Sequence, residues 1–94
     1  MTKEEILTFL RENKTLLQEQ YHVTKIGLFG SYARDEAHEE SDIDILVEMP
    51  SQFDLYYDLK EYLETHLHKT IDLGLQKSMR PFIEDFIKKD LIHV

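Results

Sequence analysis

The sequence contains no cysteine. This absence excludes disulfide bonds, zinc sites built on thiolates and a cysteine nucleophile. No apolar run approaches the roughly 20 residues that cross a bilayer. The N-terminal Met-Thr-Lys-Glu-Glu is charged and lacks the apolar region of a signal peptide. We therefore expect a cytoplasmic protein that does not associate with a membrane.

Basic residues are also few, because 11 Lys and Arg stand against 19 Asp and Glu, which gives a formal net charge of −8. Phosphates repel an acidic surface, so we expect no direct binding to a nucleic acid backbone. A nucleotide remains compatible if a metal neutralises its charge, and the acidic surface favours a basic protein partner. The 94 residues, 41% of them apolar, predict a single domain over residues 1–94.

The hydrophobic pattern predicts a small α/β fold, with helices packed on a mostly three-stranded mixed sheet. A capping-box pattern at Thr2 and Glu5 precedes the first expected helix. We expect helices over residues 3–20, 54–66 and from Pro81 onward, strands over residues 23–29, 42–47 and 70–75, a short helix near residues 31–34, and an edge strand within residues 91–94. The expected apolar stripe of the last helix consists of Phe82, Ile83, Phe86 and Ile87.

Two aspartates interrupt the second expected strand. Side chains alternate faces along a strand, so Asp42 and Asp44 point the same way, with Cα atoms about 6.5–7 Å apart. Two like charges on one face cost stability, and a divalent cation offsets that cost directly. Hard oxygen ligands at this spacing suit Mg²⁺ or Mn²⁺. The alternative is that both carboxylates simply face water.

The first expected strand ends in Gly30-Ser31. Glycine lets a phosphate approach the backbone closely, and a helix that starts there offers free N–H groups to an anion. The alternative is an ordinary strand-to-helix turn with Ser31 as the N-cap. We expect Gly30→Val to weaken nucleotide binding more than folding. Arg34 follows, and its planar guanidinium suits a phosphate, or else forms a surface ion pair with Asp35 or Glu36.

Asp72 lies between Ile71 and Leu73 in the third expected strand. If its face matches that of Asp42 and Asp44, three carboxylates converge beside a phosphate-binding turn. Carboxylates that hold a cation beside phosphates are typical of phosphoryl or nucleotidyl transfer, and a further carboxylate can take a proton from the attacking hydroxyl. The alternative is a lone aspartate facing solvent.

These segments together resemble a known signature. Gly30-Ser31, ten residues and then Asp42-Ile43-Asp44 is similar to the motif of the DNA polymerase β-like nucleotidyltransferase superfamily. The stretch from Gly27 to Arg34, followed by residues 41–47, resembles its minimal nucleotidyltransferase (MNT) branch, and Ile71-Asp72-Leu73 resembles the third motif. The resemblance covers nearly the whole chain.

The resemblance implies a small nucleotidyltransferase fold. It implies that Gly30 and Ser31 hold the triphosphate of ATP, that Asp42 and Asp44 coordinate two Mg²⁺ ions, and that Asp72 completes the metal-binding triad and activates the acceptor hydroxyl. Many MNT proteins of this kind are antitoxins encoded beside a HEPN-domain ribonuclease toxin. They transfer AMP from ATP to a tyrosine of that toxin, and a hetero-oligomeric complex is expected.

One position departs from the family pattern, because relatives often carry glycine directly after the Arg34 position, where this chain has Asp35. Two other functions therefore stay open. One is a nucleotidyltransferase with a small-molecule or RNA acceptor. The other is a degenerate fold that neutralises a partner by binding alone.

Overall fold

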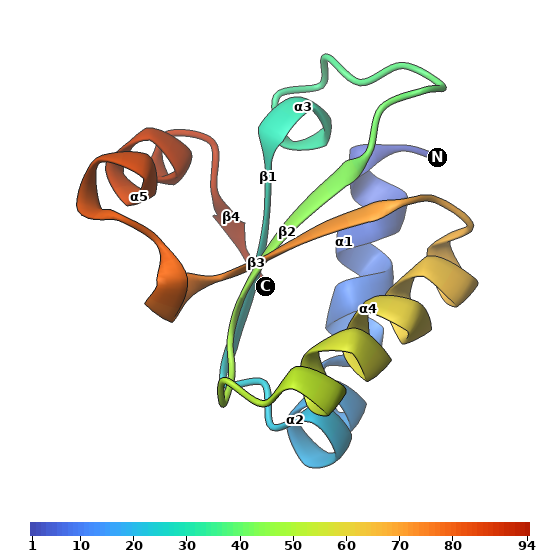
Figure 1. Ribbon diagram of the computed structural model, residues 1–94. Coiled ribbons are helices and arrows are strands. Elements are labelled where there is room, and N and C mark those ends of the chain that lie inside the picture. The colour runs from blue at the N-terminus through green and yellow to red at the C-terminus, as the bar shows by residue number, and fades with distance from the viewer.

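The computed structural model describes all residues, 1–94, and its centre is a four-stranded mixed sheet with strand order β3-β2-β1-β4. The strands are β1 (Lys25–Phe29), β2 (Ile43–Glu48), β3 (Ile71–Leu75) and β4 (Ile92–His93). The helices are α1 (Lys3–Glu12), α2 (Lys14–Tyr21), α3 (Gly30–Ala33), α4 (Phe53–Leu67) and α5 (Pro81–Lys88), with a 3-10 turn, η1 (Gln76–Ser78). Figure 1 shows α1, α2 and α4 on one side of the sheet and α5 on the other.

The sheet has one short strand more than the three main strands predicted. The fourth strand, β4, is only two residues long and pairs antiparallel with Gly27 and Leu28 of β1. It falls inside the segment expected as an edge strand. Strand β1 also pairs antiparallel with β2, whereas β2 and β3 run parallel, so the sheet is mixed as expected.

The first expected helix is in fact two helices that meet at Asn13. The Asn13 side chain donates a hydrogen bond to the carbonyl oxygen of Phe9 at 2.9 Å and accepts one from the hydroxyl of Tyr62 at 3.0 Å. An asparagine side chain that binds the preceding turn competes with the helical backbone, which accounts for the break. The capping box of Thr2 and Glu5 is confirmed.

Alternation along the strands separates an apolar face from a functional one. One core of 17 buried residues lies between the sheet and helices α1, α2 and α4. From β2 it receives Ile43, Ile45 and Val47, while Asp44 and Leu46 point to the opposite face. This opposite face also carries Asp72, and we call it the open face because no long helix packs across it.

The apolar stripe expected on the last helix is mostly not part of the core. Only Ile87 is buried, whereas Phe82, Ile83 and Phe86 are 67%, 39% and 68% exposed. Pro81 occupies the first turn of α5, as expected. No helix in the structure combines the length and the apolar character needed to cross a membrane.

Candidate active site

Two of the three predicted carboxylates stand side by side on the open face. The parallel register of β2 and β3 pairs Asp44 directly with Asp72. Neighbouring strands lie about 4.8 Å apart, so the two side chains are near neighbours. Asp42 lies just before β2, and its side chain is exposed.

Partial burial and, after it, the neighbouring acids raise the pKa of the Asp44 carboxyl from its ordinary 3.8 to about 6. Partial burial is the largest cause, because it penalises the charged form. The negative charge of Asp72, a hydrogen bond between the two carboxyl groups and the charge of Asp42 act in the same direction. The positive charge of Arg34 opposes them. All three predicted acids therefore interact electrostatically at one place.

Gly30 touches this cluster and cannot be replaced without moving it. Its φ angle is +75°, a left-handed conformation that glycine adopts at little cost. A Cβ atom on Gly30 would lie 2.1 Å from Oδ2 of Asp44, far inside van der Waals contact. Gly30, which directly follows β1, is therefore packed against the Asp44 carboxylate.

Ser31 lies one residue further, in the first turn of α3, and no hydrogen bond of its hydroxyl is found within the chain. The backbone N-cap of α3 is Phe29, so Ser31 is not the N-cap residue of that helix. The short turn places Gly30 and Ser31 beside the acidic cluster, as the sequence predicts.

Arg34 ends α3, and its guanidinium is already engaged by two carboxylates. Its Nε lies 3.0 Å from Glu36, and its Nη1 lies 2.8 Å from Asp90. The Glu36 pair was one of the two expected alternatives, but Asp90 was missed. Asp90 is 56 residues away in the sequence, in the segment between α5 and β4, and no local pattern points to it. Arg34 thus joins α3 to the end of α5.

The residues of the site can hold a divalent cation such as Mg²⁺ together with substrate phosphates. No group of three or more His, Asp or Glu side chains is arranged to enclose a metal ion. Asp44 and Asp72 nevertheless offer carboxylate oxygens from adjacent strands, and Mg²⁺ is commonly held by one or two carboxylates together with substrate phosphates. The raised pKa of Asp44 is the expected property of clustered acids that lack a counter-charge.

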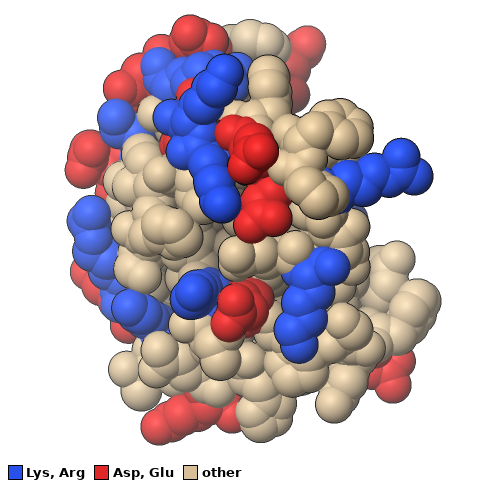
Figure 2. Space-filling model, turned by 90° about the vertical axis from the view of Figure 1, so that its left-hand side faces the viewer, with Lys and Arg blue, Asp and Glu red and all other residues tan.

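The open face is not uniformly acidic, despite the net charge of −8. Figure 2 views the molecule from the side on which α5 lies and shows acidic side chains near the middle, with basic side chains on either side of them. This side of the molecule therefore carries both positive and negative charge.

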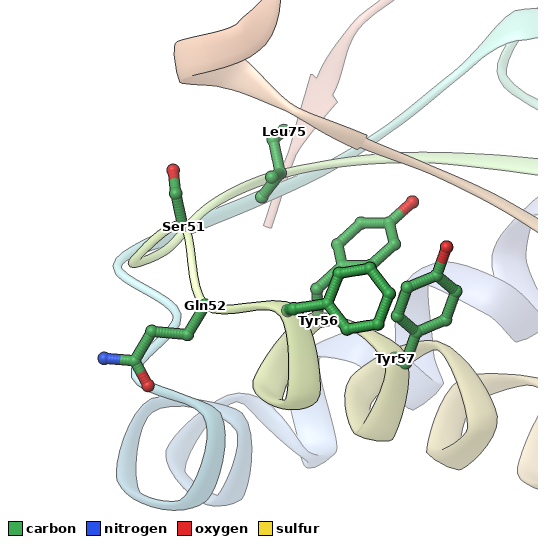
Figure 3. A pocket seen from close by; sticks show the side chains of 6 residues that line it. Ser51, Gln52, Tyr56, Tyr57 and Leu75 are labelled. Carbon is green, nitrogen blue, oxygen red and sulfur yellow. The ribbon is translucent and has the colours of Figure 1, made fainter.

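A separate hollow was not anticipated from the sequence. It has a volume of about 280 Å³ and lies between the first turns of α4 and the end of β3. Figure 3 shows Tyr56 and Tyr57 projecting from α4, with Leu75 on the strand and Ser51 and Gln52 on the connection that precedes the helix.

Comparison with known proteins identifies the family. The model of the nucleotidyltransferase domain matches residues 5–94. The chain is 46% identical over 98 residues to a Methanocaldococcus jannaschii protein named "Putative protein adenylyltransferase", covering 99% of this chain and 98% of that protein. It is 40% identical over 97 residues to protein adenylyltransferase MntA of Thermococcus cleftensis, covering 100% and 97%.

Solved structures show the same fold. One described as a "putative minimal nucleotidyltransferase" superposes with a TM-score of 0.84 at 26% identity, covering 98% of this chain and 95% of that one. A toxin–antitoxin complex with AMP-PNP gives 0.71 at 24% identity, covering 99% and 72%. A complex of tri-AMPylated Shewanella oneidensis HEPN toxin with MNT antitoxin gives 0.61 at 22%, covering 97% and 66%. The matched model and the full-length relatives show that the chain belongs to the nucleotidyltransferase domain family, in its small MntA-like branch.

Proposed function

We propose that this chain is a Mg²⁺-dependent protein adenylyltransferase that transfers AMP from ATP to a tyrosine hydroxyl of a HEPN-domain toxin, and thereby acts as its antitoxin. The observation that carries the proposal is the direct pairing of Asp44 with Asp72 on the open face, in contact with Gly30. The relatives that share 40–46% identity over the whole chain are named as protein adenylyltransferases.

Each residue of the site has a part in this chemistry. Gly30 and Ser31 bind the triphosphate, and Asp42, Asp44 and Asp72 hold the cation. Asp72 also accepts the proton of the tyrosine hydroxyl. The tyrosine oxygen forms a bond to the α-phosphorus, and the bond from that phosphorus to the leaving pyrophosphate breaks. A bound divalent cation neutralises phosphate charge and stabilises the transition state.

The HEPN partner is proposed from the neighbours and from charge. Two neighbours of the same fold are antitoxins in complex with toxins, one of them an AMPylated HEPN toxin. A chain with a net charge of −8 also has the electrostatic character to attract a basic, RNA-cleaving protein. A hetero-oligomeric complex of the two proteins is part of the proposal.

Intact-mass spectrometry tests this function directly. The HEPN-domain protein encoded beside this chain is incubated with the chain and Mg-ATP, and we expect it to gain one or more AMP units. Asp44→Asn and Asp72→Asn should each slow the transfer by at least about a hundredfold, because each removes several kcal/mol of transition-state stabilisation. Asp85→Asn, a charge change at an exposed position of α5, is the control and should leave the transfer intact.

The other outcomes point to the two competing functions. A stable complex that forms without any mass gain means that the fold neutralises its partner by binding alone. Neither mass gain nor complex formation directs the search to small-molecule or RNA acceptors. Full activity of Asp44→Asn contradicts the assigned site.

A further inference from the structure

The hollow beside α4 has a wall of exposed aromatic rings. Phe53 and Tyr57 are 76% and 50% exposed, with ring centroids 4.7 Å apart, and Tyr56 meets Tyr57 edge-on at 5.1 Å. Leu75, Ser51 and Gln52 complete the lining. We call this cavity the aromatic hollow. Exposed rings that pack only on one another leave apolar surface in contact with water, which a ligand can bury.

The aromatic hollow is linked to the active site through the edge of the sheet. The hydroxyl of Tyr56 donates to the carbonyl oxygen of Leu73 at 2.5 Å, and Leu73 directly follows Asp72. The charge of Asp72 contributes, after burial and Tyr57, to raising the pKa of Tyr56. Leu75 lies three residues beyond Asp72, which is about 10 Å along a strand. Alternation points the Leu75 side chain to the face opposite Asp72, so a segment that fills the hollow must pass around the β3 edge to bring a tyrosine to Asp72.

The position of Asp72 sets the side from which an acceptor enters. Strand β3 is an edge of the sheet, and the open-face row runs from Phe29 through Asp44 to Asp72. Gly30, which is assigned to the phosphates, follows Phe29 at the other end of that row. The nucleotide and the acceptor hydroxyl then approach the row from opposite sides, and the acceptor side is the one that adjoins the aromatic hollow.

The β3 edge favours recognition by side chains over strand addition. Side chains of α4 already hold two outward-facing backbone groups of β3. Glu64 accepts from the N–H of Ile71 at 3.0 Å, and Tyr56 donates to Leu73. An incoming segment cannot pair with those groups while they are engaged, so its hold on the protein must come from a pocket such as the aromatic hollow.

The lining is unsuited to a nucleotide and suited to one apolar side chain. It contains no lysine or arginine to balance a phosphate. Its volume of about 280 Å³ is just below the roughly 300–1,000 Å³ of pockets that take drug-sized ligands. We propose that the aromatic hollow holds an apolar or aromatic side chain of the acceptor protein, on a segment that passes around the β3 edge to the tyrosine that is adenylylated. This inference rests on the proposed function and names how that site selects its acceptor.

Truncation of the two exposed rings tests the inference. Phe53→Ala and Tyr57→Ala should each raise the KM for the HEPN-domain protein by about ten- to a hundredfold, which is the effect of losing one buried aromatic contact. The kcat should change by less than about twofold. Transfer to N-acetyltyrosinamide, which has no residue to place in the hollow, should be unchanged. Phe82→Ala on α5 is the matched control, since Phe82 is 67% exposed and lies outside the hollow, and its KM should equal that of the unaltered chain.

A binding measurement separates the failure of docking from the failure of the function. In the Asp44→Asn background, calorimetry with the HEPN-domain protein should show the same loss of affinity for Phe53→Ala and Tyr57→Ala. Unchanged KM and affinity in both variants overturn the docking site, even if the unaltered chain transfers AMP. A loss of affinity in Phe82→Ala alone overturns the docking site and places acceptor binding on α5 instead. An unaltered chain that neither transfers AMP nor binds overturns the docking site and the proposed function together.

Discussion

The contact between Gly30 and Asp44 makes these two residues a single unit. Glycine is required at position 30 for two independent reasons. Its φ angle is +75°, and a Cβ atom there would lie only 2.1 Å from Oδ2 of Asp44. A larger residue at position 30 is therefore expected to cost folding as well as nucleotide binding. Any side chain at position 30 strains the backbone and displaces the carboxylate at once.

We expect Gly30→Ala to lower the free energy of unfolding by about 1–2 kcal/mol, the cost of a left-handed conformation for a residue with a Cβ atom, and to reduce AMP transfer. Chemical denaturation and calorimetry with Mg-ATP measure the two effects. Gly74→Ala is the control, because the one atom that its Cβ would crowd is the flexible Cε end of Met79, at 2.8 Å. Unaltered stability and transfer in Gly30→Ala contradict this account.

Asp44 also makes stability depend on pH. Its pKa is about 6 in the folded chain and 3.8 as an ordinary aspartate. The folded state therefore holds this proton more tightly, so the contribution to stability is complete below about pH 4 and is lost as the pH rises through 6. At neutral pH the ionised carboxylate destabilises the metal-free fold.

Asp44→Asn should accordingly raise the free energy of unfolding of the metal-free chain at pH 7.5. The expected gain is roughly 1 kcal/mol, because solvent screens the charge of a half-buried group. This gain corresponds to a rise of about 4–8 °C in Tm. The difference in stability between Asp44→Asn and the unaltered chain should be smaller at pH 4.5. Thermal unfolding in EDTA, with Asp85→Asn as the charge-matched control, provides the measurement. An equal difference in stability at both pH values means that the ionised carboxylates do not cause it.

At the scale of elements, the turn after α3 carries a conformation that its residue does not favour. Asp35 has a φ angle of +59°, in the left-handed region, at the position where relatives often carry glycine. It is held by an ion pair to Lys3 of 2.9 Å, which raises the pKa of that lysine through the hydrogen bond to Asp35. Asp35 thus adopts a conformation that glycine favours and adds a contact with the start of α1.

We expect Asp35→Gly to stabilise the chain by about 1 kcal/mol when it is made in the Lys3→Ala background, where the ion pair is already absent and only the backbone strain changes. Urea denaturation of Lys3→Ala and of the double variant gives the difference. Asp35→Ala in the same background is the control, and it should bring no such gain because alanine also disfavours this conformation. If Asp35→Ala stabilises the chain as much as Asp35→Gly does, the strain does not come from the left-handed conformation of residue 35.

The elements show where sequence reasoning works and where it stops. Strand alternation predicts one face for Asp42 and Asp44, because that periodicity is a local property of the backbone. The parallel register that brings Asp72 beside Asp44 was left open, because it depends on how two distant strands pair. The break at Asn13 depends on Tyr62, and the engagement of Arg34 depends on Asp90, which are contacts between distant segments. The stripe of α5 was correctly found as apolar, but periodicity does not say what covers it.

At the scale of the whole molecule, net charge proved a poor guide to the site. The value of −8 suggested an acidic surface, yet the open face carries basic side chains around its carboxylates (Figure 2). The overall α/β arrangement was predictable, since each strand and each long helix has its own hydrophobic pattern. The aromatic hollow was not predictable, because it is formed by residues from α4, β3 and a loop that meet only in the folded chain.

The two faces of the sheet have a consequence for how the protein tolerates change. Residues that hold the chain together lie on one face, under α1, α2 and α4, while the reactive acids lie on the other. Substitutions in a library of variants should therefore separate into two classes. Changes such as Ile45→Ala should deplete the amount of protein in the cell, whereas changes such as Asp72→Asn should leave its abundance intact and remove only its activity.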